Sequence, residues 1–196
     1  MKGIDKITSV RLAESLTERG AVSSEVITDA LYTQDKDGEP FVQVLVNGGH
    51  ITEWDLAKLV AENFNLPFLM AGNYQISEAA QQRFPVETLF KHMIVPLDSF
   101  GDIVTVAMPV MLPFDQLAAI QREHNCDLFP YVGLITENKK ILGDMFKGYH
   151  QWIDEEAKRR ECRANSGESQ LSRGGSSEWM SIFNAGDQAI QKPQRT

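Results

Sequence analysis

The first third of this chain repeats one pattern of apolar, glycine and helix-capping residues at an offset of 29 positions. Residues 11–34 correspond to residues 40–63, and the matched pairs are Leu16/Leu45, Gly20/Gly49, Val22/Ile51, Ser23/Thr52, Ile27/Leu56 and Leu31/Val60. Only the leucine and glycine pairs are identical, so the repeat is one of residue character. This pattern predicts two consecutive helical hairpins. The alternative explanation is ordinary hairpin packing, in which such positions simply face the core.

Local signals place the helices of this repeat. The candidate N-caps are Thr8 or Ser9, Ser23 and Thr52, for helices over residues 8–19, 24–34 and 52–64. Gly20 stands at the end of the first helix, where a positive φ is least costly for glycine. Residues 35–39, DKDGE, are expected to form a turn. Leu66-Pro67 is expected to end the last helix, because proline disfavours helical backbone in the residue before it.

The chain after Pro67 carries strand signals as well as helix signals. The pattern predicts one or two short helices over 77–91, a β-hairpin of 92–98 and 102–108, a helix over 114–124 and a third strand over 126–133. Pro130 has no backbone N–H, so the third strand should be an edge or irregular strand. Thr136 is the candidate N-cap of a helix to residue 146, and the helical pattern continues to about Cys162.

These elements predict an α+β fold, in which tandem helical hairpins precede a small α/β sandwich and a disordered C-terminal tail. The expected domains are a tandem helical repeat over 1–66, a small α/β unit over 67–148, and a charged helix extension with the tail over 149–196. Residues 164–178 are rich in serine and glycine. Such a segment buries too little apolar surface to offset its chain entropy, so we expect it to be disordered.

A small apolar cluster interrupts this polar tail. Trp179, Ile182 and Phe183 stand close together in the sequence SEWMSIFNAG. Large apolar groups in an otherwise polar segment are typical of a short motif that folds on a partner protein, so these three residues are candidate partner-binding residues. Two alternatives are a chance apolar patch and a segment that packs back on the core.

The net charge of the chain and its lack of long apolar runs limit the functional classes to which it can belong. The formal net charge is −8, and all of it lies on residues 1–153, because the acidic and basic residues that follow cancel. A general nucleic-acid binder needs a basic face, so that class is excluded. No apolar run approaches the roughly 18 residues of a membrane span, and the first residues lack the apolar core of a signal peptide. Two cysteines make no disulfide framework, and the expected location is the cytoplasm.

Catalytic motifs are missing from the sequence. There is no Gly-Lys dipeptide, which excludes a P-loop, and neither G-x-G-x-x-G nor G-x-S-x-G occurs. His124 and Cys126 form one close pair of soft metal ligands, but no second pair completes a site. Cys126 at a strand start is expected to be a buried small hydrophobe. We therefore expect a non-enzymatic protein without a metal or cofactor.

Two 24-residue helical motifs followed by a small α/β unit resemble the N-terminal domain, called MshEN, of type II secretion and type IV pilus assembly ATPases. The first motif reads Arg11-Leu12-Ala13, Leu16, Gly20, Val22, Ile27, Ala30-Leu31 and Gln34, and the second reads Pro40-Phe41-Val42, Leu45-Val46, Gly49-His50-Ile51, Leu56, Leu59-Val60 and Asn63. Leu66-Pro67-Phe68, residues 94–97 and residues 104–108 also resemble family fragments. The resemblance covers about residues 8–147.

The resemblance implies a ligand. In the best-matching family members the tandem motif binds cyclic di-GMP, a symmetric dinucleotide that suits a duplicated motif. Carried over, the ligand-binding residues would be Arg11, Leu12, Leu16, Gly20 and Gln34 in one half, and Phe41, Leu45, Val46 and Gly49 in the other. Glycine permits close approach of the backbone, and an arginine can reach a phosphate or a guanine edge.

The resemblance also implies a role. In the family's full ATPases a hexameric P-loop motor follows this module, whereas here the tail follows. The expectation is a stand-alone, non-catalytic regulatory or docking module of a type II secretion or type IV pilus system. Its implied partners are a motor ATPase or an inner-membrane platform protein, which would hold it at the inner membrane from the cytoplasmic side.

The sequence departs from the family pattern at several motif positions. Ala13 and Val42 stand where the motif has glycine, Pro40 carries no charge, and Asn63 is shorter than glutamine. Residues 1–68 contain six basic and eleven acidic side chains, an unfavourable setting for a dianion. These departures favour an alternative, a degenerate adaptor that docks on a platform protein or motor ATPase without binding nucleotide.

Overall fold

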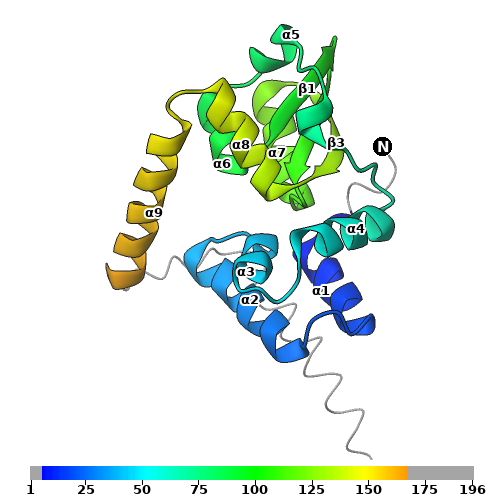
Figure 1. Cartoon of the computed structure of the whole chain (residues 1–196), viewed down its shortest axis with the longest axis vertical. Helices are drawn as coiled ribbons and strands as arrows, with labels where there is room; N and C mark the ends of the chain where they lie inside the picture. The colour runs from blue at the N-terminus through cyan, green and yellow to red at the C-terminus, as the bar shows by residue number, and fades with distance from the viewer. Residues whose placement is uncertain (1–5, 167–196) are drawn as a thin grey trace, which may run out of the picture.

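The computed structural model describes residues 6–166 as two bodies of secondary structure with a long helix at their side (Figure 1). The elements are α1 (Ser9–Glu18), α2 (Ser24–Asp37), α3 (Phe41–Asn47), α4 (Glu53–Phe64), the 3-10 turn η2 (Ala71–Asn73), α5 (Glu78–Gln81), α6 (Val86–His92), β1 (Val95–Phe100), β2 (Ile103–Pro109), α7 (Phe114–His124), β3 (Asp127–Gly133), α8 (Ile135–Met145) and α9 (Tyr149–Ser166). One cluster of buried apolar residues runs through both bodies. Within the described residues, no helix has the length and apolar character needed to span a bilayer.

The tandem repeat is a structural repeat, as predicted. Helices α1 and α2 form the first hairpin, and α3 and α4 form the second. The predicted N-caps are confirmed, because the side chains of Thr8, Ser23 and Thr52 accept hydrogen bonds from the first turns of α1, α2 and α4. Equivalent apolar positions are buried in both copies, namely Leu12/Phe41, Leu16/Leu45, Ile27/Leu56 and Leu31/Val60.

The turn inside each hairpin has the same geometry. Gly20 and Gly49 have φ angles of 61° and 68°. The backbone N–H of Ala21 donates to the carbonyl of Leu16 at 3.0 Å, and that of His50 donates to the carbonyl of Leu45 at 3.1 Å. Each glycine therefore ends its helix in the left-handed region, which side chains with a Cβ adopt at a cost.

We expect Gly49→Ala to lower the free energy of unfolding by about 1 kcal/mol, through backbone strain alone. A Cβ at this position would meet no atom within 4 Å, so no steric clash contributes. Gly20→Ala should cost a similar amount, and Gly49→Asn should cost less, because asparagine tolerates the left-handed region. Urea denaturation measures all three. Equal stability of Gly49→Ala and the unchanged protein would contradict the expectation.

The second body is built on a three-stranded sheet in the order β1-β2-β3 (Figure 1). Strands β1 and β2 form the predicted antiparallel hairpin, and β3 runs parallel to β2 after the crossover through α7. Pro130 lies in β3, which is an edge strand as predicted, and Phe68 bridges to Val132 on its open side. Helix α7 has the predicted bounds. The prediction of a small α/β unit after tandem helical hairpins is thus confirmed.

Three local predictions are wrong. Helix α2 continues through Asp37 and ends at Gly38, which has a φ of 71°, so the expected turn over 35–39 is mostly helix. Thr136 is not the N-cap of α8, since Leu134 holds that position without a side-chain hydrogen bond. The helical pattern up to Cys162 belongs to two helices, because α8 ends at Met145 and α9 starts at Tyr149.

Long-range polar contacts join the two bodies. The carboxylate of Glu53 at the start of α4 accepts hydrogen bonds from the backbone N–H and the hydroxyl of Thr136, at 2.9 and 2.8 Å. Helix α8 has no N-cap side chain that bonds to its first turn, so Glu53 supplies the acceptor for this backbone N–H. The backbone N–H of Phe114 donates to the carbonyl of Ile7 at 2.7 Å. Both contacts connect segments that are far apart in the sequence.

Candidate functional site

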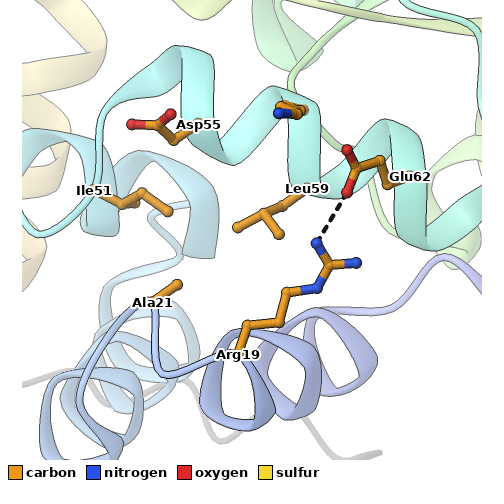
Figure 2. Close-up of a pocket in the computed structure, with 7 residues that line it drawn as sticks. Arg19, Ala21, Ile51, Asp55, Leu59 and Glu62 are labelled. Atoms are coloured by element: carbon orange, nitrogen blue, oxygen red, sulfur yellow. Dashed lines mark hydrogen bonds and ion pairs between the residues drawn. The ribbon is translucent and has the colours of Figure 1, made fainter.

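A hollow of about 360 Å³ lies where the two glycine turns of the repeat face α4 (Figure 2). We call it the turn hollow, and its lining residues are Arg19, Ala21, Ile51, Asp55, Lys58, Leu59 and Glu62. Ala21 follows Gly20 in the first turn and Ile51 follows Gly49 and His50 in the second. The two equivalent turns of the repeat therefore meet at one surface, with Leu59 of α4 beside them in the view.

Charges of both signs line the turn hollow. The guanidinium of Arg19 donates to the carboxylate of Glu62 at 2.9 Å, and this ion pair lies along one side of the hollow (Figure 2). The hydrogen bond from Arg19 lowers the pKa of Glu62 below its ordinary value. Two cations and two carboxylates line the hollow, so it carries no net charge with which to attract an anion.

We expect Arg19→Ala to raise the pKa of Glu62 towards that of an ordinary glutamate, since the hydrogen bond from Arg19 is the largest cause of the lowered value. Because the pKa of Glu62 is lower in the folded state than in the unfolded state, the ion pair stabilises the fold at pH values above the unfolded-state pKa. This stabilisation is lost as the pH falls through the folded-state pKa. The effect of Arg19→Ala on stability should therefore vanish in acid. Carboxyl ¹³C titration by NMR measures the shift, and Lys58→Ala, which removes a lesser cause, should move it less.

A second hollow, of about 470 Å³, lies beside the start of α1, and we call it the Arg11 hollow. Its lining residues are Lys6, Arg11, Glu14, Ser15, Glu18, Asn63, Phe64 and Asn65. Arg11 opens the first motif and Asn63 closes the second, so the fold brings together residues 52 positions apart. Arg11 is exposed there, beside the second cation Lys6 and the carboxylates of Glu14 and Glu18.

The large apolar residues predicted to bind a ligand lie in the hydrophobic core. Leu12, Leu16, Phe41 and Leu45 are at most 1% exposed, and Val46 is half-buried against the same cluster. A ligand cannot reach these four side chains without a rearrangement of the helices. Their common role in this structure is to hold α1 and α3 on the rest of the helical body.

The remaining predicted residues are spread over different surroundings. Gln34 links the two copies, because its side-chain oxygen accepts from the hydroxyl of Ser9 at 2.9 Å and from the backbone N–H of Phe41 at 3.3 Å. Gly20 and Gly49 are exposed in the turns, and Arg11 lies at the second hollow. The structure thus brings no more than one polar candidate to either hollow. Trp179, Ile182 and Phe183 lie outside the described residues.

Ala13 and Val42, which replace the motif glycines, are 3% and 2% exposed. Their side chains fill space in the core at the two equivalent positions of the repeat. A glycine there would leave the backbone accessible to a close approach. In this chain the methyl group of Ala13 and the isopropyl group of Val42 occupy that space.

The charged residues of the turn hollow were not found by sequence reasoning. Arg19 and Glu62 are 43 positions apart and lie in different hairpins, and neither belongs to the matched repeat pairs. The one signal in the sequence is that Arg19 directly precedes Gly20, the glycine of the first turn. Pairing of side chains across two hairpins becomes visible only when the hairpins are packed together.

The soft-ligand pair identified in the sequence has ordinary structural surroundings. The Nε2 atom of His124 is 3.2 Å from the hydroxyl of Thr88, and the ring stands edge-on to Phe84. Cys126 is buried, as predicted, and burial raises the pKa of its thiol, which makes the reactive thiolate scarce. Across residues 6–166, no three His, Cys, Asp or Glu side chains gather as metal ligands.

Known proteins resemble this chain in sequence and in fold. The type IV pilus assembly ATPase PilB of Myxococcus xanthus (strain DK1622) is 27% identical over 100 residues, which are 51% of this chain and 18% of that protein. The chain thus spans less than a fifth of that relative's length. A structure of MshE with cdg is 18% identical with a TM-score of 0.54, covering 69% of this chain and 98% of that one. The N-terminal domain of XpsE is 20% identical with a TM-score of 0.55, covering 73% and 96%.

The identities to the two solved structures are low. At such identities the two solved structures establish the fold and nothing further. The model of the MshEN domain matches residues 64–143, from the end of α4 to the last turns of α8. This match lies after the tandem repeat and covers β1, β2 and β3. Residues 64–143 of this chain therefore resemble the MshEN domain family.

Proposed function

We propose that this chain is a non-catalytic regulatory or docking module of a type II secretion or type IV pilus-like system. The MshEN match and the likeness to a pilus assembly ATPase support the process. Its proposed partners are a motor ATPase or an inner-membrane platform protein, and its proposed location is the cytoplasm, at the inner membrane through that partner.

The burial of the motif leucines favours docking over ligand binding. Leu12, Leu16 and Leu45 are at most 1% exposed, so they pack inside the helical body and do not line an open apolar pocket. Surfaces of this kind bind proteins through exposed side chains on rigid elements. The two hollows of the helical body are each lined by equal numbers of cations and carboxylates, so neither hollow has a net charge that would attract a dianion from solution.

Affinity capture from the host tests the docking function. The full chain, tagged and expressed at its natural level, is expected to retain a secretion or pilus motor ATPase or platform protein after washing. A matched bait, the unfolded chain bound to the same resin, controls for adhesion to exposed apolar surface. The absence of secretion and pilus components from repeated captures, with chemical cross-linking included, would reject the proposal.

Binding of cyclic di-GMP is the second candidate function, and the Arg11 hollow favours it. Two cations, Arg11 and Lys6, border that hollow, and the dinucleotide carries two phosphates. The fold neighbour MshE is described with cdg, an abbreviation of cyclic di-GMP. In this arrangement the ligand would lie on the surface at Arg11 and Asn63, and the buried motif leucines would only support the helices.

Calorimetric titration with cyclic di-GMP tests this second candidate. If the hollow binds the dinucleotide, Arg11→Ala should weaken the affinity about tenfold or more, since an arginine–phosphate contact contributes roughly 1.5–3 kcal/mol. Arg19→Ala, which removes the same charge from the turn hollow, is the matched control and should bind as before. If the titration releases no heat up to ~100 μM ligand, binding of cyclic di-GMP is rejected and docking is the proposed function that stands.

A further inference from the structure

One face of the sheet is defined by the strand register. Cross-strand pairs place Phe100 beside Ile103, Asp98 beside Thr105, and Val95 beside Ala107 on β1 and β2. The parallel pairs add Asp127 beside Ile103, Phe129 beside Thr105, and Tyr131 beside Ala107 on β3. We call these nine residues the outer face. The alternate residues of β2 and β3, such as Val104, Val106 and Leu128, point to the opposite face and are buried.

Helix α8 covers only one end of the outer face. Val95 and Ala107 are fully buried there, and the side-chain amide of Asn138 on α8 donates to the carbonyl of Ala107 at 3.0 Å. At the other end the face is open. Phe100 is 67% exposed and Ile103 is 48% exposed, at the tip of the β1–β2 hairpin.

The open end continues as an apolar strip on β3. The rings of Phe129 and Tyr131 lie 5.5 Å apart, and both side chains are partly exposed. Isolated apolar side chains are common on protein surfaces, but a contiguous aromatic strip on a sheet face is a feature of binding sites. The strip lies on a well-defined backbone, because β2 pairs with a strand on each side. Gly101, with a φ of 61°, forms the turn between β1 and β2.

Carboxylates border this strip. Asp127 and Asp98 belong to the outer face itself, and Asp102 stands exposed in the hairpin tip next to Ile103. None of the nine outer-face residues is lysine or arginine. The exposed part of the face therefore combines large apolar groups with carboxylates and has no lysine or arginine of its own.

We propose that the outer face docks a cationic amphipathic segment of a partner protein, with apolar side chains on Phe100, Ile103 and Phe129 and lysine or arginine on the bordering carboxylates. This inference rests on the proposed docking function and names the surface that performs it. Charge complementarity selects the partner. A second copy of this face would bring like charges together, and an anionic membrane surface would be repelled by the same carboxylates.

A synthetic helical peptide of leucine and lysine is the probe, added to the full ¹⁵N-labelled chain and followed by NMR. The triple variant Phe100→Ser, Asp102→Asn and Asp127→Asn should weaken binding about tenfold, since it removes the aromatic anchor and two charges. The matched control is Tyr32→Ser, Asp29→Asn and Asp35→Asn, which removes an exposed aromatic residue and two carboxylates from α2. This control should change the affinity less than about twofold.

The expected chemical-shift changes lie on β1, β2 and β3 around the hairpin tip, and they should weaken with added salt. Changes centred on α2, or equal losses in the two triple variants, would overturn the proposal. So would binding of phosphatidylserine vesicles that the outer-face variant abolishes, because the face would then recognise a membrane. Circular dichroism shows whether each variant retains its fold.

Affinity capture separates this proposal from the proposed function on which it rests. If the unchanged chain retains a motor or platform component and the outer-face variant loses it, both are supported. If the outer-face variant retains the component as well as the α2 control does, docking stands and the outer face is rejected. If the unchanged chain retains no such component, the docking function itself is rejected.

Discussion

Leu45→Ala is expected to lower the free energy of unfolding by about 3 kcal/mol. Leu45 is fully buried in α3, within the core cluster that joins the helical hairpins to the sheet. Truncation removes its transfer free energy and leaves a cavity, because neighbouring helices relax only in part. Leu16→Ala should cost a comparable amount, since Leu16 occupies the equivalent position of the first copy and is 1% exposed.

Urea denaturation monitored by circular dichroism measures both variants. Glu14→Ala, an exposed change on α1, is the control and should alter the free energy by less than about 0.5 kcal/mol. A loss below about 1 kcal/mol for Leu45→Ala would mean that this side chain is not packed in the core. In that case the motif leucines would be available to a ligand, and their burial would no longer favour docking over nucleotide binding.

Asn138→Ala is expected to lower the free energy of unfolding by about 3 kcal/mol as well, for a different reason. Asn138 is fully buried in α8, and its side-chain amide donates to the carbonyls of Met93 and Ala107, at 2.9 and 3.0 Å. Alanine removes this donor from both carbonyls in a buried place, where each lost partner costs roughly 1–3 kcal/mol. Met93 itself has a φ of 49°, so this hydrogen bond also holds a strained turn.

Denaturation and amide hydrogen exchange together check this second prediction. Lys140→Ala, an exposed change on the same helix, is the control and should be almost neutral. Exchange should become faster in β1, β2 and the first turns of α8, where the amide of Asn138 joins helix to sheet. Equal stability of Asn138→Ala and Lys140→Ala would show that the two carbonyls find other donors.

Much of the fold was predictable because its signals are local. The caps at Thr8, Ser23 and Thr52, the turn at Gly20 and the span of α7 all depend on residues within one or two turns of each other. Local hydrogen bonds and backbone preferences decide these features, so a reading of neighbouring residues finds them. The same holds for the hairpin of β1 and β2, whose alternation and turn are contiguous.

In two of the three wrong predictions, tertiary contacts override the local signal. Thr136 has the side chain of an N-cap, but its hydroxyl donates to Glu53, which stands 83 positions earlier. The helical pattern is interrupted between Phe146 and Gly148, and α9 starts at Tyr149. The buried ring of Tyr149 packs on Phe90, with the ring centroids 4.8 Å apart. Tertiary packing outweighed local helix propensity at both places.

The candidate site shows the same division. Residue types along the motif identified the repeat and its apolar positions, but not which of those positions face solvent. Leu16 and Leu45 proved to be core, Gln34 proved to link the two copies, and Arg19 met Glu62 across the hairpins. Exposure and charge pairing are properties of surfaces, and a surface exists only after the helices have packed.

The amino-acid sequence by itself determined the helices, their caps, the glycine turns and the duplication, because hydrogen bonds and backbone strain within a few residues decide them. The tertiary structure alone decided that the motif leucines are buried and that α8 leaves one end of the sheet face open between Phe100 and Phe129. The physical reason is that burial depends on which elements cover a residue, and those elements come from distant parts of the chain.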